Sequence, residues 1–224
     1  QGEQWTSLDE MLERMPAPEG DAKKALYYIV GDDPRSISFS PHLDDFKARG
    51  IEVLLLSEPI DSFMLMGLTN GYKDAEFKNI ASAELDKKEE KPEETPEATP
   101  EQKGLLDLFK TTLGEKIAEV RASTRLSNSV ARLVDVEGGM NPEMQRVYKY
   151  LGREYEQPKK ILEINTNHPL VAGISALDAQ PELQAKLIGQ VLDSALLLDG
   201  GAPDPAQMVQ RIQDLMSELV QRSA

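Results

Sequence analysis

Apolar residues recur along the chain with two different spacings, on either side of a polar stretch. In residues 1–85, helical patterns with apolar residues three or four positions apart alternate with compact apolar runs typical of strands. The expected order is helix 6–15, strand 24–31, helix 40–50, strand 51–57, helix 58–68 and strand 75–81. This alternation predicts a small three-layer αβα domain around a parallel sheet.

Residues at the helix ends support this assignment. Ser7 and Glu10 have the spacing of a capping box at the start of the first helix. In the second helix Ser40 is a candidate N-cap, Pro41 suits the first helical position and Gly50 suits the stop. The predicted boundaries therefore have a local chemical basis as well as a hydrophobic pattern.

The stretch 86–103 is almost entirely polar. It reads DKKEEKPEETPEATPEQK, with Pro92, Pro96 and Pro100 and no large apolar side chain. Proline breaks a helix that runs through it, and charged stretches rich in proline stay solvated. We therefore predict an extended acidic linker between a first domain, 1–85, and a second domain, 104–224.

The second domain is predicted to mix helices and strands and to end in two helices. The strands are expected at 116–123, with Ile117 and Val120 inward, at 129–138 and at 159–165. The helices are expected at 104–114, at 138–152, at 181–201 and from Asp204 onward. The chain as a whole is therefore predicted to be an α/β protein, α+β overall.

The last two helices each carry a long apolar face, and the second keeps a heptad-like 4-3-4 spacing. The residues on the two faces are Leu183, Leu187, Val191, Leu198, Met208, Ile212, Leu215 and Leu219. Two alternatives remain open for these faces. The helices form a four-helix bundle with a second copy of the chain, or they pack only on their own domain.

The stretch GGMNPEMQRVYKYLG, 138–152, predicts a well-capped amphipathic helix. Asn141 can cap it, Pro142 suits its first position and Gly152 can end it. Its apolar face contains Met140, Met144, Val147, Tyr148 and Leu151. This face is either a buried core face or a surface kept exposed for partners.

Composition narrows the classes of function. The chain has 224 residues, no cysteine and a formal net charge of −14. It can therefore form no disulfide or sulfur-ligated metal site, and its charge argues against binding a nucleic-acid backbone. The longest apolar runs are too short to span a membrane, and no signal-peptide pattern is present. We expect a cytoplasmic protein, with an organellar matrix as the alternative, and a piece of a longer chain, since the first residue is not Met.

Motifs for catalysis are missing from the sequence. It contains no Gly-rich phosphate loop and no Gly-x-Ser-x-Gly nucleophile motif. His42, at a helix start, is expected to be solvated or hydrogen-bonded, and His168 is expected to belong to a structural turn. Neither has a second histidine at metal-binding spacing. We therefore predict no catalytic, cofactor or metal residues, and a small αβ enzyme is the weakest of the alternatives.

Four segments nevertheless resemble one family closely. SPHL, GIEVLLLSEPID, RLSNSVARLV and EINTNHPLV occur in the order and spacing of the distal half of the ninety-kilodalton heat-shock chaperones. The resemblance covers nearly the whole chain outside the linker. The last residues, LVQRSA, resemble the bacterial or organellar branch, because they lack the acidic tail and the retention signal of other branches.

The resemblance implies a division of labour along the chain. Residues 1–85 would be the small distal part of the family's middle domain, and 104–224 its C-terminal dimerisation domain. The ATP-binding domain and the segment with the catalytic arginine have no counterpart here. The resemblance thus implies that this chain alone does not hydrolyse ATP and that ATP and magnesium would bind elsewhere in a longer protein.

The resemblance also implies sites and partners. Non-native client proteins would contact the helix at 138–152 and the helix at 58–68, in a cleft between two copies of the chain. The implied client residues are Phe63, Met66, Met140, Met144, Val147, Tyr148 and Leu151, and those of the helix at 138–152 are expected to be at least partly exposed. The implied dimer residues are Leu187, Val191, Leu198, Met208, Ile212, Leu215 and Leu219. Cochaperones are further candidate partners, and a scaffold or adaptor that holds no client is the alternative function.

Overall fold

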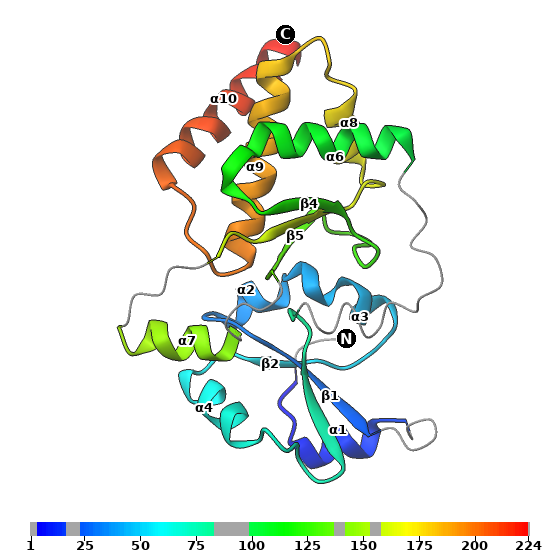
Figure 1. Ribbon diagram of the computed structural model, residues 1–224, viewed down its shortest axis with the longest axis vertical. Helices are drawn as coiled ribbons and strands as arrows, with labels where there is room; N and C mark the ends of the chain where they lie inside the picture. The colour runs from blue at the N-terminus through cyan, green and yellow to red at the C-terminus, as the bar shows by residue number, and fades with distance from the viewer. Residues whose placement is uncertain (1–3, 17–22, 83–98, 137–141, 153–157, 224) are drawn as a thin grey trace.

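The computed structural model contains two three-stranded sheets, each with its own helices, and the two resulting units lie one above the other (Figure 1). It describes residues 4–16, 23–82, 99–136, 142–152 and 158–223. We call the described part up to residue 82 the first unit and the part from residue 99 the second unit. This architecture confirms the predicted α/β class.

The first unit follows the predicted alternation of helices and strands. Its elements are α1 (Leu8–Arg14), β1 (Lys24–Val30), α2 (Pro34–Ser38), the 3-10 helix η1 (Pro41–Leu43), α3 (Asp44–Ala48), β2 (Leu54–Leu56), α4 (Pro59–Gly67) and β3 (Ala75–Asn79). The short helix α2 was not predicted. It begins at Pro34, where the Asp33 side chain caps it by accepting a hydrogen bond from the Ser36 backbone N–H.

The sheet of the first unit has the order β2-β1-β3, and both pairs are parallel, as predicted. Successive side chains of a strand point to opposite faces, so β1 supplies two cores. Leu26 packs with Met11 of α1 on one face, and Ile29 packs with Phe46 of α3 on the other. The sheet is therefore the middle of three layers.

The predicted helix ends of the first unit are confirmed in part. The Glu10 N–H donates to the Ser7 hydroxyl at 3.2 Å, and the Ser7 N–H donates to the Glu10 carboxylate at 2.8 Å, which completes the capping box. The predicted helix 40–50 is instead η1 followed by α3, and Ser40 makes no side-chain cap. Gly50 ends it in the left-handed conformation, with φ +67°.

The second unit contains the three predicted strands. Its elements are α6 (Pro100–Leu113), the 3-10 helix η2 (Gly114–Lys116), β4 (Glu119–Ala122), β5 (Ala131–Val134), α7 (Pro142–Tyr150), β6 (Ile161–Ile164), α8 (Pro169–Ser175), α9 (Pro181–Leu198) and α10 (Pro205–Ser223). The sheet order is β4-β6-β5, with β6 parallel to β4 and antiparallel to β5. The strand that comes last in the chain is therefore the central one.

The predicted linker extends too far toward the C-terminus. Helix α6 begins at Pro100, because proline is accepted at the first helical position, and Thr99 and Gln102 form a capping box in front of it. Residues 100–103 are thus helical and not extended. The part of the predicted linker before Thr99 lies outside the described residues.

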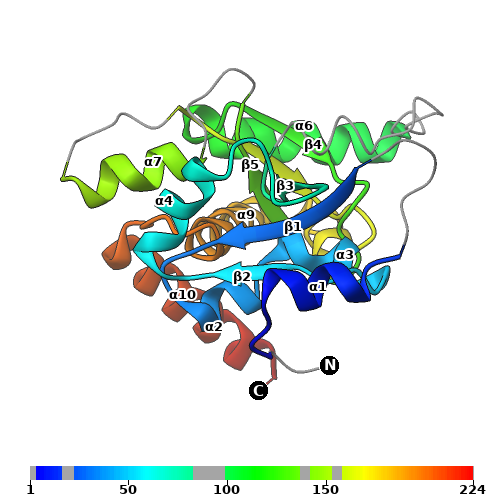
Figure 2. The same cartoon turned by 90° about the horizontal axis from the view of Figure 1, so that it is seen from below.

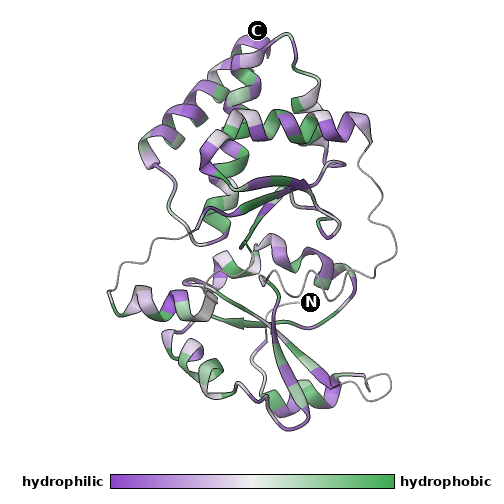
Figure 3. Ribbon diagram, viewed as in Figure 1, coloured by the Kyte–Doolittle hydropathy of each residue, from purple (hydrophilic) through white to green (hydrophobic). Residues whose placement is uncertain are grey.

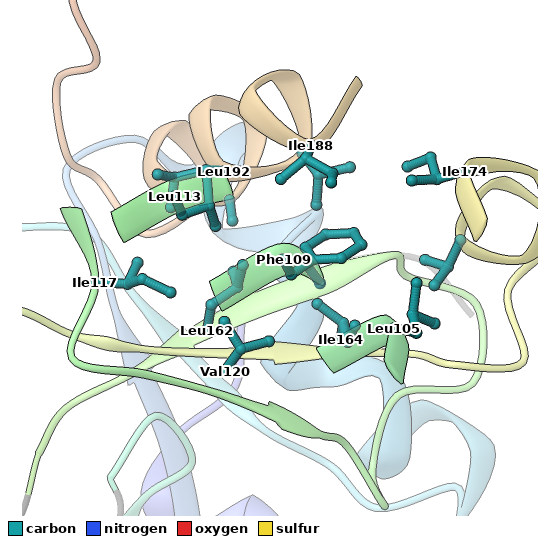
Figure 4. Close-up of a cluster of buried hydrophobic side chains, with 14 of the residues drawn as sticks. Leu105, Phe109, Leu113, Ile117, Val120, Leu162, Ile164, Ile174, Ile188 and Leu192 are labelled. Carbon is teal, nitrogen blue, oxygen red and sulfur yellow. The ribbon is translucent and has the colours of Figure 1, made fainter. Parts of the chain in front are cut away.

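Helices cover one face of the second sheet. Phe109 of α6 and Ile188 of α9 meet Leu162 and Ile164 of β6 in one buried cluster (Figure 4). Along α6, apolar and polar residues alternate in the way expected for a helix with one buried face (Figure 3). Ile117 and Val120 are both buried, as predicted. The opposite face of the sheet carries charged residues and points toward the first unit.

We expect the replacement of Phe109 by alanine to lower the free energy of unfolding by about 3–5 kcal/mol, because it removes a fully buried ring and leaves a cavity. Urea unfolding followed by circular dichroism measures this change. Thr111→Ala, on the exposed side of the same helix, is the control and should shift the value by less than about 0.5 kcal/mol. A loss below about 1 kcal/mol for Phe109→Ala would contradict this core.

Candidate functional site: the surface between α4 and α7

Three charged residues lie side by side on the face of the second sheet that meets the first unit. Strand register places Arg121 and Arg132 directly opposite Glu163, one on each side. The Glu163 carboxylate accepts hydrogen bonds from both guanidinium groups, each 2.5 Å away at the closest atoms. Burial by itself raises the pKa of Glu163, but the charges and hydrogen bonds of the two arginines outweigh it and hold the pKa below its usual range.

His42 of η1, in the first unit, contacts this group of charged residues. Its Nδ1 lies 3.4 Å from Nη1 of Arg132, and its ring is buried. Burial and the neighbouring positive charge of Arg132 lower the pKa of His42 well below its usual value, so the ring is neutral and Nδ1 can accept from the guanidinium. The expected hydrogen-bonded role is confirmed, and the alternative of a solvated His42 is wrong.

Two residues after His42, Asp44 attaches the first unit to a loop of the second. Its carboxylate accepts hydrogen bonds from the backbone N–H groups of Asn128 and Ser129, at 3.0 and 2.7 Å. Arg125, from the same loop, lies over the ring of Phe46, 5.3 Å from its centroid. The segments SPHL and RLSNSVARLV, which carry the family resemblance, therefore meet each other at the boundary between the units.

This docking leaves α7 of the second unit beside α4 of the first. The two helices lie next to each other in both Figure 1 and Figure 2. Among the described side chains of α7, only Val147 is buried, with 7% of its surface exposed. Arg146 forms an ion pair with Asp32, which follows β1, with Nη2 and Oδ1 3.0 Å apart. The contact thus combines one buried valine, worth about 1.5–3 kcal/mol, with an ion pair worth less than about 1 kcal/mol.

A pocket of about 320 Å³ lies between the two helices. Its lining residues are Asp32, Pro59, Ser62, Phe63, Arg146, Val147 and Tyr150. The Ser62 hydroxyl is buried there without a hydrogen-bond partner among the described atoms. The pocket is a partly open hollow whose lining combines apolar residues with Asp32, Ser62 and Arg146.

Two of the predicted client residues, Phe63 and Val147, line this pocket, and the exposure of the others is as follows. Phe63 of α4 is 41% exposed, Met66 is similarly exposed, and Leu151 just after α7 is more exposed still. Met144 and Tyr148 are half-buried, as predicted for that helix. The prediction that Val147 is exposed is wrong, because its side chain packs toward α4 and lines the pocket.

Met140 lies outside the described residues, whereas two further apolar residues of α4 and α7, not among the predicted client residues, are exposed. They are Ile60 in the first turn of α4 and Tyr150 in the last turn of α7, both about two-thirds exposed. Spacing gave a signal for both, because Ile60 lies three residues before Phe63 and Tyr150 lies three residues after Val147. Tyr150 lines the pocket beside α4, and the position of α4 was the information missing from the sequence.

The predicted dimer face on α9 needs a second correction. Val191 is 6% exposed and belongs to the core of its own unit, and Leu187 packs against the same core. These residues therefore follow the alternative in which α9 packs on its own domain. Leu198 is half-buried.

Helix α10 packs on α9 and exposes a row of apolar residues on its other side. Lys186 of α9 pairs with Asp214 of α10 at 3.1 Å, and Asp193 pairs with Arg211. The predicted residues Met208, Ile212 and Leu215 are half-buried, and Leu219 is 67% exposed.

Additional exposed residues on the terminal helices are Leu197, Val209, Met216 and Val220. Val209, Met216 and Val220 each follow a predicted residue of α10 by one position, so they form a second row with the same 4-3-4 spacing. Gln213 takes the second position of this row. Because Gln213 is polar, this second row is not continuous in the hydrophobic pattern and was not predicted.

The described part of the chain offers little for other kinds of chemistry. Within it, no three residues among His, Asp and Glu gather closely enough to hold a metal ion. His168 caps α8, and its Nδ1 accepts from the Leu170 N–H at 3.1 Å, which confirms the structural turn. A search of the described helices finds none with the length and apolar character needed to cross a membrane.

The profile of the family described as Hsp90 protein matches residues 1–224. The sequence is 35% identical to the chaperone protein HtpG of Alcanivorax borkumensis over 216 residues, covering 96% of this chain and 33% of that protein. Identity to the chaperone protein HtpG of Mycobacterium ulcerans is 38% over 225 residues, with coverage of 96% and 34%. Identity to the chaperone protein HtpG of Mycobacterium tuberculosis is 36% over 231 residues, covering 99% of this chain and 34% of that protein. The chain therefore spans about a third of the length of these relatives.

The neutral state of His42 predicts a pH dependence of stability. Its folded pKa lies below the unfolded value of about 6.5, so the unfolded chain binds the proton first and stability falls as the pH drops below about 6.5. Urea unfolding from about pH 7.5 to about pH 5.5 should show that His42→Gln removes part of this fall, up to about 1.4 kcal/mol per pH unit. A difference between the two proteins that stays constant across this pH range would contradict the buried neutral ring.

Proposed function

Because the chain belongs to the Hsp90 protein family, we propose that it is the part of a bacterial-type molecular chaperone that holds non-native proteins and joins two copies of the chain. Its partners are then a second copy of itself and unfolded client proteins in the cytoplasm. We propose no nucleotide chemistry for this chain, because the resemblance aligns it with the distal half of the family, outside the ATP-binding domain. ATP and magnesium would be bound by a part of a longer protein that this chain does not contain.

The observation that carries the proposal is the exposed apolar surface on α4 and α7. Phe63 and Met66 lie three residues apart, on one side of α4. Tyr150, the last residue of α7, lines the same pocket as Phe63, and the exposed Leu151 follows it. Apolar side chains gathered on a surface usually mark an interaction site. Methionine and large rings adapt to varied partners, so this surface suits unfolded chains with no fixed shape.

The exposed row on α10 supports the second half of the proposal. Val209, Met216 and Val220 face away from α9, and Leu219 lies beside them. A second copy of the chain offers the same row, and two self-complementary rows form a symmetric dimer. The half-buried residues of α10 then stabilise the helix pair within one copy, and the exposed row joins the copies.

The client proposal predicts that Phe63→Glu combined with Leu151→Glu weakens the suppression of aggregation of a heat-unfolded protein by at least about five-fold in the concentration required. Each charge would be placed where apolar contacts with a client form, which costs about 1 kcal/mol or more per lost contact. Light scattering of the aggregating protein is the measurement.

The matched control for this experiment is Phe39→Glu. Phe39 is even more exposed than Phe63, but it follows α2 and does not line the pocket. Equal loss of activity in the control and the test variant would remove the claim for this surface and leave only a general effect of negative charge. Full activity of the test variant would favour the adaptor alternative.

The dimer proposal predicts a mass of twice the 24.9 kDa chain by light scattering after gel filtration at micromolar concentration. Met216→Glu combined with Leu219→Glu should give the monomer mass, because it places four carboxylates in the apolar contact between two copies. Gln221→Glu, which adds a charge to the same helix at a polar position, should leave the dimer intact. A dimer that survives the double substitution would place the contact on another face.

A further inference from the structure

Helix α7 covers part of the surface that the proposed function assigns to clients. It belongs to the second unit by sequence, but the element that it contacts most is α4 of the first unit. Val147 is buried by this contact, and Ser62 of α4 is buried beneath it. The covered residues and the exposed residues Phe63 and Tyr150 line one pocket, so α7 hides the inner part of a surface whose rim is open.

An ion pair lies at the edge of this contact. The Arg146 side chain is 20% exposed and reaches from α7 to Asp32 in the loop after β1, which is 60% exposed. Both residues line the pocket. The pair therefore connects the two units beside the apolar surface and restrains α7 from moving away from α4.

One polar group in the part of the surface that α7 covers lacks a hydrogen-bond partner among the described atoms. Ser62 is 2% exposed, and its hydroxyl has no such partner. Such a group is costly to bury, and it gains a partner when water or another polypeptide reaches it. The contact is also small, with one buried valine among the described side chains of α7, so local opening is within reach of ordinary fluctuations.

We propose that the Asp32–Arg146 ion pair holds α7 closed over α4, so that the chain partly covers its own binding surface, and that unfolded polypeptide binds more tightly to the form in which α7 has moved away. This inference rests on the proposed function, since it concerns the same surface. A polypeptide that binds only the open form has its apparent affinity reduced by the closed fraction, so weakening the ion pair raises that affinity.

Two single substitutions and one charge-reversed double variant test the ion pair. Arg146→Gln and Asp32→Asn each remove one charge and keep a similar shape, and Asp32→Arg with Arg146→Asp restores the pair with reversed charges. Arg14→Gln is the matched control, because it removes a surface ion pair with Glu52, at 2.9 Å, away from the pocket. All five proteins, including the unchanged chain, are compared at one salt concentration.

Hydrogen exchange read by mass spectrometry measures the opening without any client. The amides of 143–151 should exchange about two- to five-fold faster in both single variants, which is the range expected for an exposed ion pair. In the charge-reversed variant and in Arg14→Gln, these amides should exchange at the rate seen in the unchanged chain. The amides of α9 serve as an internal reference in every protein. Unchanged exchange over 143–151 in both single variants would overturn the inference.

Binding is measured with a fluorescein-labelled, reduced and carboxymethylated α-lactalbumin, which stays unfolded. Its dissociation constant, read by anisotropy, should fall about two- to five-fold in the single variants. In the charge-reversed variant it should return to the value of the unchanged chain. Weaker binding in the single variants would overturn the inference, because the ion pair would then build the surface and not cover it. Faster hydrogen exchange with unchanged binding would overturn the preference of the polypeptide for the open form, whereas no binding to any of the five proteins would contradict the proposed function of the surface.

Discussion

The arrangement of the two units depends on a buried carboxylate between two arginines. Strand register places Glu163 between Arg121 and Arg132, and the side chains next to it in sequence point to the opposite face, into the apolar core. The register of one small sheet therefore decides both which face the helices cover and which face carries charge. Removing one partner of such a buried pair typically costs about 3–5 kcal/mol, because the remaining charge has no compensation.

The first unit docks on this charged face through groups that match it in detail. A neutral His42 accepts a hydrogen bond from Arg132, and Asp44 accepts two from the backbone of the loop 125–129. Directional contacts of this kind specify one relative orientation more strictly than apolar burial does. That orientation brings α7 of one unit to α4 of the other and so creates the pocket, which neither unit could form alone.

Much of the fold could be predicted from the sequence, because alternating and helical spacings report burial within one element. The strands, the capping box at Ser7 and the helix at 142–150 all follow from such local signals. The predictions failed where a second element decides the outcome. Val147 shares a stripe with Met144 and Tyr148, and only the position of α4 makes it the buried one. Val191 lies on an apolar face broad enough for two neighbours, and the sheet of its own unit takes that side.

We propose that the apolar surface on α4 and α7 contacts unfolded polypeptide directly. The most direct measurement is photo-crosslinking with a benzophenone amino acid placed at Phe63, at Leu151 or at Phe39, which are all exposed positions. We expect crosslinks between an unfolded polypeptide and the first two positions, and much weaker crosslinks at Phe39. Crosslinks of equal yield at all three positions, or at Phe39 alone, would contradict it.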